Sequence, residues 1–308
     1  MKKFLAALLI CTVLMTCLTG CGTEARKEGL NIVVTVFPAY DWVRTVLGSD
    51  NITLLLDNGV DLHSYQPTAA DLVNISQCDL FVYIGGESDA WVADALANPV
   101  NPNRKVLNLM ELLGEDALEE EEVEGMEAEE EEEEEAFDEH IWLSLKNAQA
   151  LVPQIAAALC DLDPDRADAY TQNSNAYVQK LSALDDQYQK AVEEKRFDTL
   201  LFGDRFPFRY LVEDYDLDYY AAFSGCSAES EASFETVSFL ANKLKELGLP
   251  AVMVLEGSDQ KLAQTILDTA GVTADIVSVD SMQSVEAQDA TYLSIMEKNL
   301  TAFQAALG

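Results

Sequence analysis

The chain has only two histidines among its 308 residues, His63 and His140. Acidic residues stand close to both, with Asp61 two positions before His63 and Asp138 two positions before His140. A neutral imidazole is the commonest side-chain ligand for zinc, and a neighbouring carboxylate can orient its ring. Either histidine taken alone is better explained as a surface or capping residue, because no HExxH or CxxC spacing is present.

The formal net charge of −36 is concentrated in one segment. Seventeen acidic residues and no basic residue lie between positions 115 and 139. This composition predicts a disordered loop, because it contains too little apolar surface to fold. The charge excludes nucleic acids as partners and favours cations. The loop either concentrates cations near a binding site or only keeps the chain soluble. Its unbroken acidic run consists of Glu129, Glu130, Glu131, Glu132, Glu133, Glu134 and Glu135.

The N-terminus predicts export and lipid attachment. Two lysines precede an apolar stretch at 4–18, which is too short to serve well as a transmembrane helix. Leu-Thr-Gly-Cys at 18–21 resembles a bacterial lipobox, in which Cys21 becomes the lipidated first residue of the mature chain. An ordinary signal peptide with a chance cysteine is the alternative. We expect a protein anchored by its lipid on the extracytoplasmic face of the bacterial cell membrane.

Short apolar runs rich in β-branched and aromatic residues alternate with amphipathic stretches along the chain. The runs predict buried strands of parallel sheets, and the amphipathic stretches predict helices that cover them. The predicted strands are 31–37, 52–56, 80–84, 106–109, 199–202, 219–222, 251–255 and 274–279. The predicted helices are 39–47, 68–76 with Thr68 as N-cap, 234–247, 261–270 and 289–307.

A long helix is predicted between the two groups of strands. Asp163 and Pro164 are typical of a helix start, and apolar residues from Tyr177 to Ala191 recur at alternating spacings of four and three. The pattern indicates about 30 residues, or roughly 45 Å of helix. The fold class is therefore α/β: two similar lobes of parallel sheet with flanking helices, joined by one long rigid helix, with a metal site in the cleft between them.

These features predict seven segments. They are a lipoprotein signal peptide (1–20), a tether (21–30), an N-terminal α/β lobe (31–114), an acidic disordered loop (115–137), the end of the N-terminal lobe (138–160), the connecting helix (161–197) and a C-terminal α/β lobe (198–308).

The segments around the two histidines resemble the ligand motifs of a known family. Residues 59–67 read GVDLHSYQP, and residues 138–144 read DEHIWLS. Both are similar to metal-ligand motifs of the zinc- and manganese-uptake binding proteins, the substrate-binding lipoproteins of metal ABC importers. The resemblance covers the mature chain in the order of its elements, including the long helix and the position of the acidic loop.

The resemblance implies a third and a fourth ligand from the second lobe. Asp280, directly after the last predicted strand, matches the family's aspartate, and capping of the next turn is its alternative role. At the third position an ungapped match places Arg205, whose guanidinium has no lone pair for a metal. The preceding Asp204 is the expected ligand, with a strand-end cap paired to Arg205 as its alternative. The reserve ligands are Cys226, Glu229 and Glu231.

By this resemblance, His63, His140, Asp204 and Asp280 would hold a divalent transition metal, Zn²⁺ in first place and Mn²⁺ next. The implied function is capture of the metal by a monomer and its delivery to an ABC transporter permease and its ATPase. Because ligation requires neutral imidazoles, affinity should fall below about pH 6. A surface metal buffer or adhesin using the same site is the alternative. An enzyme is not expected, since a metallohydrolase would need a general base that neither histidine motif supplies.

Overall fold

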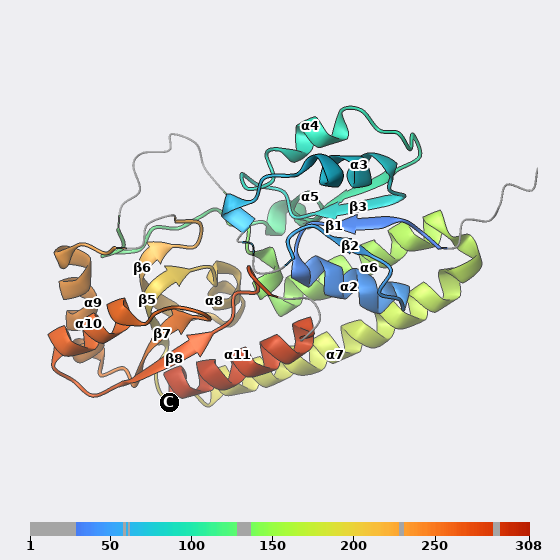
Figure 1. The fold of residues 1–308 in the computed structure, drawn as a ribbon. Coiled ribbons are helices and arrows are strands. Elements are labelled where there is room, and N and C mark those ends of the chain that lie inside the picture. Colours follow the sequence, from blue (N-terminus) through green and yellow to red (C-terminus); the bar gives the residue numbers. More distant parts are fainter. Residues whose placement is uncertain (1–28, 58–59, 61, 128–136, 228–230, 286–289) are drawn as a thin grey trace, which may run out of the picture. The chain divides into compact units, whose positions relative to one another are not determined.

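Two parallel four-stranded sheets form the framework of the chain (Figure 1). The computed structural model describes residues 29–57, 60, 62–127, 137–227, 231–285 and 290–308. The first sheet has the strand order β2-β1-β3-β4 and the second has β6-β5-β7-β8, so the two lobes share one topology. The strands are β1 (Ile32–Val34), β2 (Thr53–Leu54), β3 (Leu80–Tyr83), β4 (Lys105–Asn108), β5 (Thr199–Phe206), β6 (Asp218–Ser224), β7 (Ala251–Leu255) and β8 (Asp275–Val279).

Each lobe is built from strand–helix–strand units, as predicted from the alternation of apolar runs. In both sheets the chain order reverses at the first strand, which pairs in parallel with the second and the third. Loops that follow neighbouring strands therefore diverge at the carboxyl edge of each sheet, which is where open parallel sheets bind ligands. The helices of the first lobe are α2 (Phe37–Leu47), α3 (Ala69–Gln77), α4 (Val92–Leu96), α5 (Leu109–Leu113) and α6 (Leu145–Leu162). Those of the second lobe are α8 (Arg209–Tyr215), α9 (Phe234–Leu247), α10 (Lys261–Ala270) and α11 (Tyr292–Leu307).

Helix α7 (Ala167–Glu193) runs along both lobes, packing on α2 and α6 in the first and on α8 and α11 in the second (Figure 1). Its 27 residues agree with the predicted length, and the predicted apolar stripe is buried from Tyr177 to Tyr188, with Ala191 at its end only partly buried. The start differs, because Pro164–Arg166 forms a 3₁₀ turn before the α-helix begins at Ala167. Asp163 ends α6 and opens this turn, so α6 and α7 form one helical hairpin.

Helix α6 was not predicted from the sequence. Pro153 lies in its interior, where proline removes one hydrogen bond and is normally unfavourable. The helix still forms because the hydroxyl of Ser144 caps its N-terminus, accepting a hydrogen bond from the backbone amide of Asn147 at 2.9 Å. One face of α6, including Leu151, Ile155 and Leu159, is fully buried. Burial of this face outweighs the local cost of the proline.

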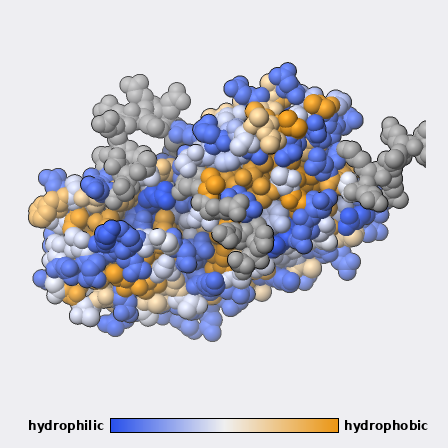
Figure 2. Space-filling view, in the orientation of Figure 1, coloured by the Kyte–Doolittle hydropathy of each residue, from blue (hydrophilic) through white to orange (hydrophobic). Residues whose placement is uncertain are grey.

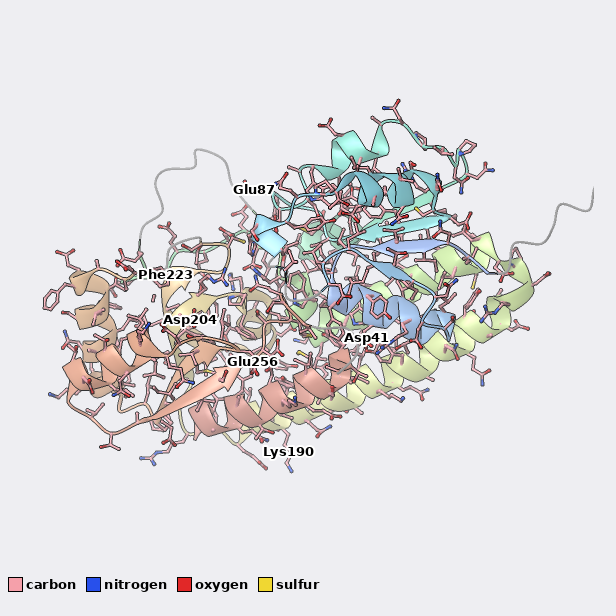
Figure 3. All side chains as sticks on the ribbon, in the orientation of Figure 1. Asp41, Glu87, Lys190, Asp204, Phe223 and Glu256 are labelled. Carbon is pink, nitrogen blue, oxygen red and sulfur yellow. The ribbon has the colours of Figure 1, made fainter. Side chains whose placement is uncertain are left out.

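Asp41 joins helices of both lobes in a buried position (Figure 3). Its carboxylate on α2 accepts hydrogen bonds from the hydroxyl of Tyr177 on α7 at 3.3 Å and from the backbone amide of Tyr292 on α11 at 3.1 Å. Burial raises the pKa of Asp41, while its ion pair with Arg44 opposes that rise. One carboxylate therefore ties the connecting helix to both lobes.

The described part of the acidic segment is packed on the C-terminal lobe, which corrects the prediction of a disordered loop over 115–137. The Glu121 carboxylate pairs with Arg209, and the backbone amide of Glu127 donates to the carbonyl oxygen of Ala222 at 2.9 Å. Gly125 has φ +85°, and a Cβ there would lie 2.0 Å from the ring of Phe239. This part of the segment is packed because the second lobe offers it a cation, a backbone carbonyl oxygen and an aromatic surface. The run Glu129–Glu135 lies outside the described residues.

Hydrophilic residues cover much of the face shown in Figure 2 and surround separate hydrophobic patches. Within the described ranges, none of the helices combines the length and hydropathy required to cross a bilayer. The predicted signal peptide and the predicted lipid site at Cys21 lie outside those ranges.

Candidate metal centre

His63 and His140, which are 77 positions apart in the sequence, face each other with ring centroids 5.4 Å apart. His63 lies on a 3₁₀ turn (Leu62–Ser64) that follows β2, and its side chain is partly exposed. His140 directly precedes another 3₁₀ turn (Ile141–Leu143) and is completely buried. The predicted meeting of the two imidazoles is therefore present in the structure.

Asp138 positions the ring of His140. One oxygen of its buried carboxylate accepts hydrogen bonds from the backbone amide of His140 at 2.7 Å and from the ring Nδ1 at 3.0 Å. The hydroxyl of Tyr210 donates to the carbonyl oxygen of Asp138 at 2.8 Å, which holds this segment against the second lobe. A carboxylate accepts but cannot donate, so Nδ1 carries the proton and the lone pair of Nε2 points into the site.

Ser88 positions the ring of His63 in a similar way. Its hydroxyl lies 2.8 Å from Nδ1 of His63, and its backbone amide donates to the Glu139 carboxylate at 2.7 Å. Glu139 is the neighbour of His140 in the sequence, so the two histidine motifs are joined behind the rings. Burial raises the pKa of Glu139, and the hydrogen bonds from Ser88 oppose that rise.

Asp89 supports the loop that carries Ser88. One oxygen of its buried carboxylate accepts hydrogen bonds from the backbone amides of Ile84 and Gly85, both at 3.0 Å. The other oxygen is buried without a hydrogen-bond partner among the described residues. Burial, together with the charge of Glu139, raises the pKa of Asp89 to about 6. The folded protein therefore disfavours the ionised form relative to a solvent-exposed aspartate.

Cys226 is the third side chain that joins the histidines. One ligand atom from each of His63, His140 and Cys226 lies within 4.8 Å of the other two. Cys226 follows β6 in a loop that comes close to the site because of Gly225, where a Cβ would lie 3.0 Å from Cε1 of His140. Burial and the charge of Glu120 raise the pKa of the Cys226 thiol. A bound cation would reverse this balance, since a coordinating thiol is deprotonated by the metal.

Gln283 occupies the position between the rings, and the sequence analysis missed it. Its side-chain nitrogen lies 2.9 Å from Nε2 of His63 and 2.7 Å from Nε2 of His140. The residue is 8% exposed and comes from the loop between β8 and α11. The only signal in the sequence is its position three residues after Asp280 in the same loop.

Asp204 lies within β5 rather than at its end, because the strand extends to Phe206 past a register shift between Phe202 and Arg205. Its two carboxylate oxygens accept hydrogen bonds from the backbone amides of Arg205 at 2.9 Å and Leu255 at 3.2 Å. Figure 3 shows Asp204 among the strands of the C-terminal lobe, in the same region as Glu256. This carboxylate holds β5 against the end of β7, and it lies outside the group that contains the two histidines.

The Asp280 carboxylate also binds a backbone amide. One oxygen accepts from the amide of Met282 at 2.7 Å, while the side chain of Asn299 binds both backbone groups of Asp280 at 2.8 and 2.9 Å. Burial and the charge of Glu256 raise the pKa of Asp280. Within the described ranges, the group of potential metal ligands contains neither Asp204 nor Asp280. Of the reserve ligands, Glu231 is exposed and Glu229 lies outside the described residues.

The group can supply two imidazole nitrogens and one thiolate sulfur to a single cation. Nitrogen and sulfur donors are typical of zinc, whereas manganese prefers oxygen ligands. The nearby carboxylates of Asp138, Glu139 and Glu120 add negative charge, which favours a cation over a neutral ligand.

Comparisons with known proteins agree with this chemistry. The family model for the periplasmic zinc-uptake complex component A matches residues 32–306. The chain is 31% identical over 314 residues to the zinc-binding lipoprotein AdcA of Streptococcus pneumoniae, covering 99% of this chain and 61% of that protein. It is 30% identical over 322 residues to the high-affinity zinc uptake system protein ZnuA of Bacillus subtilis, covering 100% of this chain and 99% of that protein.

The fold is similar to that of a solved zinc-bound structure. The ZnuA-like domain of Streptococcus pneumoniae AdcA, crystallised with Zn(II), superposes with a TM-score of 0.72 and 29% identity. The match covers 90% of this chain and 98% of that domain. The chain thus spans 61% of the length of the full AdcA relative but nearly all of its ZnuA-like domain.

Proposed function

This chain belongs to the family of periplasmic zinc-uptake complex component A proteins, and from that membership we propose that it captures a divalent transition metal, zinc in first place, outside the cytoplasm and delivers it to a membrane importer. The importer would be an ABC transporter permease with its ATPase, and the chain would act as a monomer. Capture and release require no chemical reaction, so we propose a binding protein rather than an enzyme.

One observation carries this proposal. Two imidazoles from separate segments direct Nε2 toward the same point, where the amide nitrogen of Gln283 lies 2.9 and 2.7 Å from them. Asp138 and Ser88 bind the opposite ring nitrogens, as is usual for histidines that ligate metals. A purely structural histidine pair would not require both lone pairs on one side.

We propose His63, His140 and Cys226 as direct ligands. The sequence-based alternatives Asp204 and Asp280 accept hydrogen bonds from backbone amides and lie outside the group formed by the histidines and Cys226. The thiol favours zinc over manganese, because manganese binds sulfur poorly. Manganese remains the second candidate if carboxylates replace Cys226.

Lipidation at Cys21 would keep the chain beside its importer. The relative AdcA of Streptococcus pneumoniae is named as a lipoprotein, which supports the predicted lipobox at 18–21. An acyl anchor fixes the protein to the membrane surface without spanning it. We also propose that the acidic run Glu129–Glu135 raises the local cation concentration near the site.

The test is zinc and manganese binding to the purified chain, measured by calorimetry and by metal content after purification without chelators. We expect about one zinc per chain. We expect this zinc to be lost in each of the single variants Cys226→Ala, His63→Ala and His140→Ala. Cys160→Ala is the matched control, since Cys160 on α6 is outside the group. Unchanged zinc binding in both His63→Ala and His140→Ala would overturn the proposal.

A surface metal buffer or adhesin could use the same ligands without transport. Zinc uptake by a strain lacking this chain separates the two functions. Restored uptake by the wild-type chain, and not by His140→Ala, supports delivery to an importer. Uptake that is independent of the chain supports the alternative.

A further inference from the structure

The side-chain amide of Gln283 has a defined orientation. Its Oε1 accepts a hydrogen bond from the hydroxyl of Ser281 at 2.9 Å, which directs the nitrogen toward the two histidines. An amide nitrogen carries two hydrogens and no available lone pair. It can therefore donate one hydrogen to Nε2 of His63 and the other to Nε2 of His140.

This orientation agrees with the proton positions on both rings. His140 donates from Nδ1 to Asp138, so its Nε2 is free to accept. Gln283 can donate to Nε2 of His63 only when Nδ1 carries the proton, and the Ser88 hydroxyl is placed to accept from Nδ1 in that tautomer. Both lone pairs that a zinc ion would use are thus bound by one neutral amide.

The backbone of the β8–α11 loop presents Gln283 to the site. Met282 is buried and adopts φ +59°, a left-handed conformation that is unfavourable for a residue with a side chain. The Asp280 carboxylate stabilises this turn by accepting from the amide of Met282. On the other side, the indole of Trp142 donates to the carbonyl oxygen of Ser281 at 2.8 Å. The loop is therefore held to both lobes in the conformation that directs Gln283 inward.

We propose that Gln283 is an internal competitor for the metal: its amide binds the two imidazole lone pairs and must leave them before a cation can take both. This inference rests on the proposed function, because it concerns the affinity and entry rate of the same site. It also gives Asp280 a role as a positioning residue, since its carboxylate supports the turn that carries Gln283. The competitor would keep zinc affinity low enough for later release.

The discriminating experiment is Gln283→Leu, which replaces the amide with an apolar side chain of similar width. Two ordinary hydrogen bonds are lost from the competing arrangement, so we expect zinc to bind about tenfold more tightly or better. The association rate measured by stopped flow should rise as well. Gln187→Leu on the exposed side of α7 is the matched control and should leave affinity unchanged.

The outcomes separate the two proposals. If His140→Ala abolishes zinc binding and Gln283→Leu weakens it, the proposed function stands, but Gln283 is a ligand through its oxygen and the competitor is rejected. An affinity of Gln283→Leu equal to that of Gln187→Leu also rejects the competitor. If zinc binding is unchanged in both His63→Ala and His140→Ala, the proposed function itself fails.

A second measurement on the wild-type chain does not depend on how a variant folds. With only two histidines, long-range proton–nitrogen NMR spectra of chelator-treated protein can report the tautomer of each ring. We expect both rings to carry the proton on Nδ1, with a slowly exchanging side-chain amide for Gln283. A proton on Nε2 of either ring would overturn the inference, because that nitrogen could not accept from Gln283.

Discussion

The two lobes share one strand order but use their acidic residues differently. In the N-terminal lobe, Asp138 binds the ring nitrogen of a histidine, and its neighbour Glu139 binds the segment that orients the other histidine. In the C-terminal lobe, Asp204 and Asp280 bind backbone amides at the ends of strands. The comparison indicates that an acid orients a ligand where a histidine ring is near and supports the backbone where only amides are near.

The sharpest way to break this comparison is to remove a histidine from the first lobe. His140→Ala should raise the Kd for zinc by about a hundredfold or more, because loss of a direct ligand exceeds the 10–100-fold loss typical of supporting residues. Calorimetry against a competing chelator measures the change, and circular dichroism checks the fold. An affinity within threefold of wild type would remove the first lobe from the site.

Asp89 tests how strongly the first lobe buries its acids. Its folded pKa of about 6 lies above the usual 3.8, so its contribution to stability is present at low pH and is lost as the pH rises through 6. Relative to Asp89→Asn, the wild type should lose about 2 kcal/mol of stability between pH 4 and pH 7, because each pKa unit is worth 1.36 kcal/mol and part of the loss has already occurred at pH 4. Denaturant unfolding at both pH values, with chelator present, measures this difference. If the free energy of unfolding of the two proteins depends on pH in the same way, burial does not raise the pKa of Asp89.

Asp138→Asn changes the group that orients His140 while leaving the ligand in place. We expect zinc affinity to fall about 10–100-fold, because the neutral amide no longer favours the Nδ1–H tautomer. Titration with zinc measures the loss, with Asp204→Asn as the control acid from the other lobe. Equal effects of the two substitutions would erase the difference between the lobes.

The smallest effect on binding is expected for Asp204→Ala. Loss of its bonds to the amides of Arg205 and Leu255 should lower the free energy of unfolding by about 2 kcal/mol, as for hydrogen bonds to a charged group. Zinc affinity should change less than threefold. A hundredfold loss of affinity without loss of stability would restore Asp204 as a ligand.

Much of the fold could be predicted from the sequence, because the apolar runs and amphipathic stretches that indicate strands and helices are local patterns. Each of the eight predicted strand runs overlaps an observed strand, and the bounds of α9 and α10 agree with those of the structure. Helix α6 was missed because Pro153 and its many alanines gave a weak local pattern, and its stability comes from burial against α7. Part of the acidic segment was judged by composition alone, although Arg209 and Phe239 of the second lobe hold it.

The candidate site was less predictable, and the reason is geometric. The two histidines were found because their motifs are distinctive. The position of Gln283 depends on the left-handed turn at Met282, and no short-range sequence pattern predicts that turn. Likewise, Asp204 lies beside the amide of Leu255 only because β5 extends past a register shift. Residue spacing in the sequence does not predict the contacts that irregular backbone makes.

The buried carboxylate of Asp41 has a consequence for how cargo can leave. Because it links α2, α7 and α11, spreading the lobes would break hydrogen bonds in three helices at once. Displacing the short loop from Asp280 to Val285 would break the hydrogen bonds of Ser281 and Gln283 to Trp142 and the two histidines, but it would leave the contacts among these three helices intact. We therefore expect release of a bound metal to proceed by displacement of this loop, while the helical frame keeps its shape.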